Sequence, residues 1–199
     1  MGITSKTPYT VADLHNDLNN YRFCNFQELS DKEIMMNCLA NYPDILTRNN
    51  KLAHFTASSW IVNHEKTKVL MVYHNIYQSW SWTGGHADGE ADLCTVALRE
   101  AYEETGIFIP NYSNEIFSIE VLPVAGHQKN GNWVSSHLHL NVTYLFFADD
   151  RAPISVNQNE NSDVQWIPIE QAVAISSERE MKPIYEKLNN KLFGYSFLQ

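Results

Sequence analysis

The sequence predicts an α/β sandwich built on a mixed sheet, with a helical arm at its N-terminus. Segments of strand-forming residues lie on both sides of one central helical segment, and further helical segments occupy both ends of the chain. A length of 199 residues, with 44% hydrophobic and 19% charged residues, is ordinary for a protein with a sizeable core. We therefore expect residues 1–199 to form a single domain, with residues 1–45 as an arm packed on it.

The N-terminal arm contains two expected helices. The first begins at Thr10 and has apolar residues at helical spacing, namely Val11, Leu14, Leu18 and Tyr21. Ser30 and Glu33 form a capping-box pattern that predicts the start of a second, short helix, which stops before Pro43. We interpret the arm as a packing or dimerisation element, with a substrate-covering arm as the alternative.

A series of strands is expected after the arm. Residues 54–62 are rich in strand formers, and residues 68–74 form an apolar run typical of a strand buried on both faces. Residues 79–82 read as a short extended segment that leads into a turn at Gly84-Gly85.

The second half of the chain continues this pattern. Strands are expected at residues 116–125, 138–147 and 164–167, with a hairpin turn at Asn130-Gly131. Two helices are expected to follow, and each has a proline in its first turn, where proline is tolerated. These helices begin at Pro168 and Pro183.

The central segment, residues 84–107, carries the densest charge in the chain. Asp92 can cap a helix that runs to about Thr105, and Gly106 provides the left-handed stop.

Three carboxylates lie on one side of this expected helix. Glu100, Glu103 and Glu104 are spaced i, i+3, i+4, and Arg99 lies four residues before Glu103, where it can pair with it. Carboxylates this close repel one another unless cations intervene, and hard divalent ions such as Mg²⁺ or Mn²⁺ take oxygen ligands together with substrate phosphates. The alternative is a solvated acidic face.

The same segment closely resembles the Nudix box, G-x5-E-x7-R-E-U-x-E-E-x-G-U, where U is aliphatic. The residues in register are Gly85, Arg99, Glu100, Glu103, Glu104, Gly106 and Ile107. The resemblance implies a Nudix α/β/α sandwich and a metal-dependent hydrolase of diphosphate linkages. It also implies that the three glutamates and the carbonyl of Gly85 hold the metal, and that Arg99 orients the glutamates.

One position departs from the box. Its first glutamate falls on Ala91, with Glu90 one position early and Asp92 one position late. In the family this acid is largely a structural partner within the box, so either neighbour could replace it.

Nudix enzymes commonly recruit a further acid from a loop, as a base or as a metal ligand. The loop before Trp166 offers Glu160, our first choice, and Asp163. Glu120 could also face the cleft from its strand. The alternative for each is an ordinary structural or solvated carboxylate.

Histidines and aromatic residues supply candidates for substrate binding. His86 follows the double glycine, where it could bind phosphate, and Trp82 lies just before it, where it could stack on a flat group. His137 and His139 share one face of a strand. A histidine metal cluster, which would also draw on His74, is the less favoured interpretation.

Charge and composition limit the partners. A net charge of −9 argues against non-specific binding to nucleic acid or to an anionic membrane surface. An odd cysteine count of three, without a signal-peptide pattern, predicts reduced thiols and a cytoplasmic protein. The family often forms homodimers, for which the arm could serve.

We therefore predict a Mg²⁺- or Mn²⁺-dependent pyrophosphohydrolase acting on a small-molecule diphosphate, such as a nucleoside diphosphate derivative. An isopentenyl-diphosphate isomerase is one alternative. Gly84 argues against it, because that group of enzymes has a cysteine at this position. The other alternative is a non-catalytic, nucleotide-sensing Nudix module, but such modules often lose the box glutamates that this chain keeps.

Overall fold

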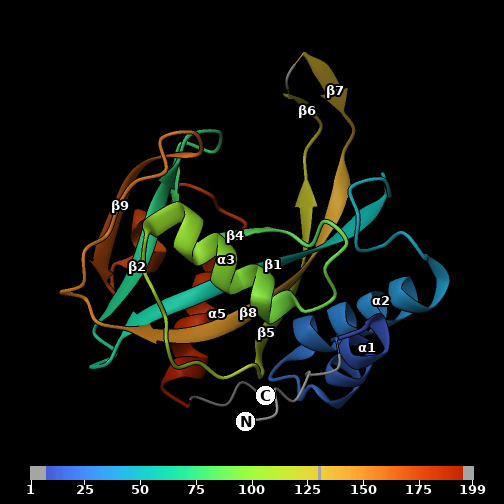
Figure 1. Cartoon of the computed structure of the whole chain (residues 1–199), viewed down its shortest axis with the longest axis horizontal. Helices are drawn as coiled ribbons and strands as arrows, with labels where there is room; N and C mark the ends of the chain where they lie inside the picture. Colours follow the sequence, from blue (N-terminus) through green and yellow to red (C-terminus); the bar gives the residue numbers. More distant parts are fainter. Residues whose placement is uncertain (1–7, 130, 195–199) are drawn as a thin grey trace, which may run out of the picture.

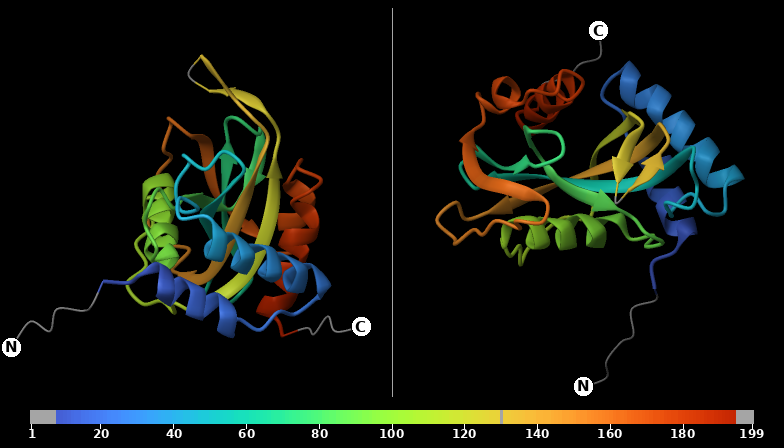
Figure 2. Two further views of the ribbon diagram at one scale, coloured as in Figure 1. Left: turned by 90° about the vertical axis from the view of Figure 1, so that its right-hand side faces the viewer. Right: turned by 90° about the horizontal axis from the view of Figure 1, so that it is seen from above.

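The structure, a computed structural model, describes residues 8–129 and 131–194 of the chain (Figure 1). A mixed sheet lies between helices on its two faces, as the two views of Figure 2 show. The helices are α1 (Val11–Asn20), α2 (Phe26–Asn41), α3 (Leu93–Thr105), α4 (Ala172–Ile175) and α5 (Lys182–Leu192). The strands are β1 (Ala53–Asn63), β2 (Lys68–His74), β3 (Ser79–Ser81), β4 (Thr83–His86), β5 (Ile116–Val124), β6 (His127–Lys129), β7 (Asn132–Val134), β8 (His137–Ala148) and β9 (Asn161–Pro168).

Strand β1 is the centre of the sheet. Within the described residues the sheet has seven strands, with a main order of β3-β2-β1-β8-β5, and β4 and β9 pair with β1 and β2. β1 runs parallel to β8 and antiparallel to β2 and β4. Every residue of β1 is buried, as expected for a strand covered on both faces. The predicted α/β sandwich on a mixed sheet is thus confirmed.

The two faces of the sheet have separate cores. Helix α3 packs on one face, where Leu93, Val96 and Ala97 join the larger core cluster. Helix α5 packs on the other face, where Tyr185 and Leu188 join the second cluster. Figure 2 shows these two helices on opposite sides of the sheet.

The arm forms the two expected helices, but the second begins earlier than predicted. Thr10 caps α1 and forms a capping box with Asp13. The cap of α2 is Asn25, whose side chain accepts a hydrogen bond of 2.9 Å from the backbone amide of Glu28. The prediction of Ser30 as the cap is wrong, because Asn25 starts the helix first and Ser30 lies within it.

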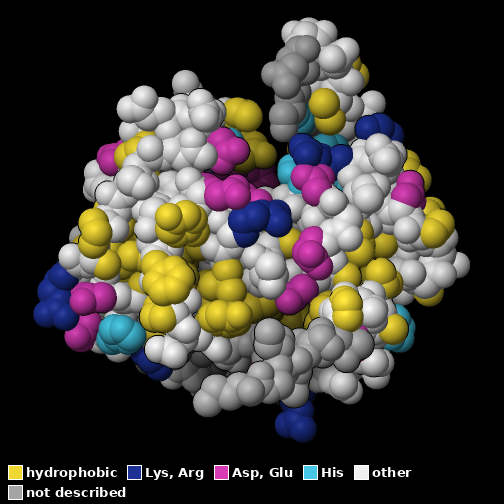
Figure 3. Space-filling model, in the orientation of Figure 1, with side chains coloured by type: hydrophobic (Ala, Val, Ile, Leu, Met, Phe, Trp, Pro, Cys, Tyr) yellow, Lys and Arg dark blue, Asp and Glu magenta, His cyan; other side chains and the backbone are white. Residues whose placement is uncertain are grey.

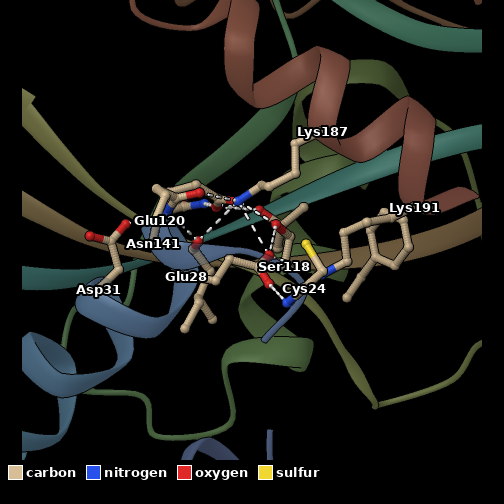
Figure 4. Close-up of polar contacts among 12 residues, drawn as sticks. Cys24, Glu28, Asp31, Ser118, Glu120, Asn141, Lys187 and Lys191 are labelled. Carbon is tan, nitrogen blue, oxygen red and sulfur yellow. Dashed lines mark hydrogen bonds and ion pairs between the residues drawn. The ribbon is translucent and has the colours of Figure 1, made fainter. Parts of the chain in front are cut away.

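The arm is also tied to the sheet and to α5 by buried charges, which we call the arm–helix charge network (Figure 4). The Nζ atom of Lys187 lies 3.3 Å from Oε1 of Glu28 and 2.9 Å from Oε1 of Glu120. Lys191 contacts the same Glu28 oxygen at 2.9 Å. The two carboxylates are fully buried, so each depends on these ammonium groups for compensation of its charge.

Several smaller predictions need correction. Gly84-Gly85 is not a free turn, because both residues belong to β4 and pair with β1. Pro168 ends β9 instead of starting a helix, and α4 spans only Ala172–Ile175. The hairpin turn predicted at Asn130-Gly131 falls between β6 and β7, and its first residue, Asn130, lies outside the described residues. The other predicted strands and the helix at Pro183 are confirmed within two to three residues of their ends.

Two further findings concern membrane-spanning helices and the cysteines. None of the helices in residues 8–129 and 131–194 combines the length and the apolar character that a membrane span requires. The thiols of Cys24, Cys38 and Cys94 are free, as predicted. That residues 1–199 form a single domain remains a prediction.

Candidate active site

The candidate site is built on helix α3 and the strand that precedes it. Asp92 caps α3 by accepting a hydrogen bond of 3.2 Å from the backbone amide of Thr95. The helix ends at Gly106, whose φ of 70° lies in the left-handed region that glycine adopts without strain. Both ends of the central helix therefore lie where the sequence predicts them.

Glu100 lies directly against Gly85. A Cβ atom placed on Gly85 would lie 2.6 Å from Oε2 and 2.7 Å from Oε1 of Glu100. Only glycine therefore leaves room for this carboxylate beside the backbone of β4. Burial raises the pKa of Glu100, and the nearby charges of Glu103 and Glu160 raise it as well, whereas Arg99 opposes the shift.

Glu104 is buried and bonded to the same strand. Its carboxylate accepts a hydrogen bond of 2.9 Å from the backbone amide of Gly84 and one of 3.0 Å from Nδ2 of Asn161. Burial is the main reason that the pKa of Glu104 is raised to about 8, and Glu160 and Glu100 act in the same direction. Sequence reasoning missed Asn161, although it directly follows the candidate Glu160.

Glu103 and Arg99 lie at the open side of the site. The side chain of Glu103 is 54% exposed, and its Oε1 atom lies 3.9 Å from Nε of Arg99. Arg99 is closer to Glu100, at 3.2 Å between Nη2 and Oε1. The predicted pairing with Glu103 is therefore present but longer than the pair with Glu100, and the orienting role of Arg99 remains a prediction.

The structure also shows what surrounds Ala91, where the box pattern has an acid. Ala91 is buried, Asp92 caps the helix, and Oε1 of Glu90 accepts a hydrogen bond of 2.9 Å from the amide of Asp92. In the described part of the chain, the ion pairs of Arg99 are those with Glu100 and Glu103. Glu90 and Asp92 thus stabilise the turn into the helix, and neither forms an ion pair with Arg99 in the described residues.

Acids outside the box take two different positions. Glu160 is exposed in the turn before β9, and its charge contributes to the raised pKa of both Glu100 and Glu104. The next residue, Asn161, donates a hydrogen bond to Glu104, so the turn that carries Glu160 contacts the box helix. Glu120 does not face the cleft, because it is fully buried in the arm–helix charge network.

The two candidates for substrate binding also differ. Trp82 is 9% exposed and packs edge-on against Tyr185 in the core, with ring centroids 5.7 Å apart. This position gives it a packing role, and its stacking on a substrate remains a prediction. His86 is half-buried, and its ring lies 5.2 Å from that of His54 and 5.0 Å from that of His139.

His86 belongs to a group of four histidines, which we call the histidine cluster. Its other members are His54, His137 and His139. Burial and the neighbouring imidazoles lower the pKa of His139 to about 2. In Figure 3, acidic side chains gather around a hollow above α3, and histidine side chains lie at its edge toward the β6–β7 hairpin.

The donor set of the box fits a hard divalent cation. Carboxylate oxygens from Glu100 and Glu104 face a glycine-lined strand, and Glu103 and Glu160 add negative charge at the open side. Burying two carboxylates close together is unfavourable without a compensating charge, as their raised pKa values indicate. Oxygen ligands of this kind suit Mg²⁺ or Mn²⁺.

A mixed sheet between helices, with a glutamate-rich helix against a double glycine, defines the class of Nudix-type proteins. The NUDIX domain family matches residues 53–188. The chain therefore belongs to the Nudix family.

A curated relative and many solved structures resemble the chain. The relative is the CMP-5'-(N-acetyl-N-hydroxy-3-aminopropyl)phosphonate hydrolase of Streptomyces rubellomurinus, with 29% identity over 119 residues, or 58% of this chain and 52% of the relative. The chain thus spans about half the length of the curated relative that it matches.

The solved structures show the fold alone. An Ap4A hydrolase binary complex from C. elegans has a TM-score of 0.53 and 19% identity, covering 70% of this chain and 98% of that one. The NUDIX domain of Shewanella oneidensis NrtR, complexed with ADP ribose, has a TM-score of 0.50 and 22% identity, covering 78% and 97%. A MutT protein from Methanosarcina mazei Go1 has a TM-score of 0.53 and 15% identity, covering 72% and 97%.

Proposed function

We propose that this protein is a metal-dependent hydrolase that cleaves the diphosphate linkage of a small molecule, such as a nucleoside diphosphate derivative. The observation that carries the proposal is the gathering of Glu100, Glu103 and Glu104 beside the double glycine of β4. An acidic helix face that served only solubility would not bury one of its carboxylates against the backbone of a neighbouring strand.

The relatives support the choice of substrate class. The curated relative is named as a hydrolase of a CMP-linked phosphonate. One similar structure is named as an Ap4A hydrolase, and another holds ADP ribose. These names share a nucleotide joined through phosphorus to a further group, which makes nucleoside diphosphate derivatives the first compounds to test.

The proposed metal ligands are Glu100, Glu103 and Glu104, together with the backbone carbonyl of Gly85. A bound Mg²⁺ or Mn²⁺ would neutralise charge on the diphosphate and lower the pKa of a water molecule. Arg99 would orient Glu100 and Glu103 through its two ion pairs. The three glutamates of α3 would also repel a phosphate that arrives without a cation, because like charges repel.

Glu160 is the proposed general base. It lies outside the helix in the turn before β9, and its neighbour Asn161 donates a hydrogen bond to Glu104, which supports a place for Glu160 near the proposed reaction centre. Glu160 would accept a proton from the attacking water, whose oxygen forms a bond to one phosphorus. The bond from that phosphorus to the bridging oxygen breaks, and the second phosphate group leaves with that oxygen. His86 is the proposed contact for a phosphate oxygen.

The experiment that tests this function is a screen of nucleoside diphosphate derivatives with Mg²⁺ and with Mn²⁺, which measures the release of AMP, phosphate and pyrophosphate. We expect metal-dependent product release from at least one compound, and incorporation of labelled oxygen from water into one product. Metal-independent turnover would contradict the assignment of the box glutamates.

Two other outcomes would replace the proposal. Tight nucleotide binding without product release from any compound would favour the nucleotide-sensing module. Migration of a carbon–carbon double bond in isopentenyl diphosphate, without phosphate release, would favour the isomerase. A homodimer and a cytoplasmic location remain predictions that this screen does not address.

A further inference from the structure

The histidine cluster is assembled from three strands that are distant in sequence. His54 lies near the start of β1, and His137 and His139 lie at the start of β8. β1 and β8 are parallel and in register, with His54 opposite His139. His137 and His139 are two residues apart on one strand, so both side chains point to the same face. His86 reaches the group from β4, on the other side of β1.

Hydrogen bonds to carbonyl groups determine where two of these imidazoles carry their protons. Nδ1 of His54 lies 3.2 Å from the carbonyl oxygen of Asn50, and Nδ1 of His137 lies 2.8 Å from that of Ser135. A carbonyl oxygen can only accept, so both Nδ1 atoms carry the hydrogen. In the neutral rings both Nε2 atoms are therefore unprotonated and present a lone pair.

These lone pairs do not find enough donors. His54 is 5% exposed, and its buried Nε2 atom has no hydrogen-bond partner in the structure. Nε2 of His137 lies 3.2 Å from Nε2 of His139. A neutral His139 has a single N–H group, so it can satisfy at most one of the two lone pairs. A buried acceptor without a partner is costly, and a cation between the rings would bind several lone pairs at once.

The ring nitrogens are close enough together to bind one cation. One ring nitrogen from each of His54, His137 and His139 lies within 4.8 Å of the other two. In a tetrahedral zinc site the bonds to nitrogen are about 2.0–2.1 Å, which places ligand nitrogens roughly 3.4 Å apart. The Nε2 atoms of His137 and His139, which are 3.2 Å apart, are already at about this separation.

The hydrogen bonds of the second ring nitrogens also match those of a metal site. Histidines that bind a metal usually donate their second ring nitrogen to a carbonyl or a carboxylate, which fixes the tautomer and the direction of the ring. His54 and His137 both do so through Asn50 and Ser135.

We propose that His54, His137 and His139 form a binding site for a transition-metal dication, Zn²⁺ in the first instance, with a water molecule as the fourth ligand. This site is distinct from the box, because imidazole nitrogens select Zn²⁺ and similar ions whereas carboxylate oxygens suit Mg²⁺ and Mn²⁺. It does not depend on the proposed function. A metal here would join β1 and β8 close to His86 of β4, next to the proposed reaction centre.

The experiment measures zinc bound to the full chain. The protein is stripped with a chelator, loaded with Zn²⁺ in excess Mg²⁺, passed through a desalting column and analysed for zinc and protein. The variants are His139→Ala and His54→Ala. The matched control is His15→Ala, which removes an exposed histidine of α1. Glu103→Gln tests whether the bound zinc resides at the glutamates of the box instead.

We expect about one zinc per chain in the unmodified protein, in His15→Ala and in Glu103→Gln, and loss of the bound zinc in His139→Ala and His54→Ala. Equal zinc content in the histidine variants and the unmodified protein would overturn the proposal. So would a zinc content that falls in Glu103→Gln, because the metal would then reside at the box.

A spectroscopic measurement keeps the proposal testable if the variants fail to fold. X-ray absorption at the zinc edge of the loaded, unmodified protein should show nitrogen ligands with the outer-shell scattering of several imidazoles. Substitution by Co²⁺ should produce the intense visible absorption of a four-coordinate site. A spectrum of oxygen ligands alone would overturn the assignment.

Discussion

Oε1 of Glu104 accepts a hydrogen bond of 2.9 Å from the backbone amide of Gly84, one residue before the glycine that faces Glu100. Two carboxylates that are one turn apart on α3 are thus positioned by two adjacent glycines of β4. Strand and helix form one unit at this point, because β4 is held by pairing with β1 and α3 packs on the same part of the sheet. A change in either element is therefore expected to disturb the other.

The first prediction concerns the box acids. Glu103→Gln and Glu104→Gln should each lower turnover of the substrate found in the screen by roughly 10²-fold or more, the loss typical of removing one preorganised electrostatic group. Each change preserves side-chain size, so the fold should be retained. The measurement is the kcat with saturating Mg²⁺, with circular dichroism as the check of folding.

Glu115→Gln is the matched control for these variants. Glu115 is an exposed acid just before β5, so the same chemical change at this position should leave kcat unaltered. Full activity of the Glu103 and Glu104 variants on the true substrate would show that the metal assignment is wrong.

The second prediction concerns Gly85. In Gly85→Ala the new Cβ would lie 2.6 Å from Oε2 of Glu100, so the carboxylate must move away from β4. We expect the affinity for Mn²⁺ to fall by roughly 10–100-fold, as when groups that orient metal ligands are disturbed. Electron paramagnetic resonance of free Mn²⁺ measures this directly. Gly131→Ala is the control. Its φ of 77° makes alanine strained there, but the new Cβ meets no atom within 4 Å and the residue lies outside the box, so the affinity for Mn²⁺ should not change. Unchanged affinity in Gly85→Ala would contradict the proposed role.

The third prediction concerns the arm–helix charge network. Lys187→Met should lower the free energy of unfolding by about 3–5 kcal/mol, because it leaves the buried carboxylates of Glu28 and Glu120 without their shared ammonium group. Arg48→Met breaks a pair with Asp88 at 2.7 Å, but both side chains are about half exposed, so the loss should stay below about 1 kcal/mol. Urea denaturation of both variants tests the contrast, and equal losses would argue against the network as a stabilising element.

The fourth prediction concerns acid stability. Burial alone would raise the pKa of Glu28, but Lys187 and Lys191 outweigh it and lower the pKa to about 2, below the value of 4.5 for an unperturbed group. A lowered pKa in the folded state contributes stability that is present above pH 4.5 and is lost as the pH falls toward 2. The difference in unfolding free energy between the unmodified protein and Glu28→Gln should therefore shrink across this range. A difference that is independent of pH would contradict the assignment.

The sequence alone predicted the parts of the fold that depend on local spacing. The helix from Leu93 to Thr105 follows from Asp92 and Gly106, which are start and stop signals within the segment itself. Strand β2 was predicted with its observed limits, because an apolar run between polar turns needs no distant partner to be recognised. The start of α2 was missed, because two residues, Asn25 and Ser30, both carry a capping side chain and the sequence does not rank them.

The family and the side of α3 that carries the acids can thus be read from local spacing, since both depend on about 23 consecutive residues. Which distant residues meet became known from the fold. Glu120 joins Lys187 and not the cleft, Asn161 reaches Glu104, and His54 meets His139. The physical reason is that these contacts follow from strand order and from the parallel pairing of β1 with β8. That pairing is stabilised by the burial of both sheet faces together and leaves no signal in the local periodicity of either strand.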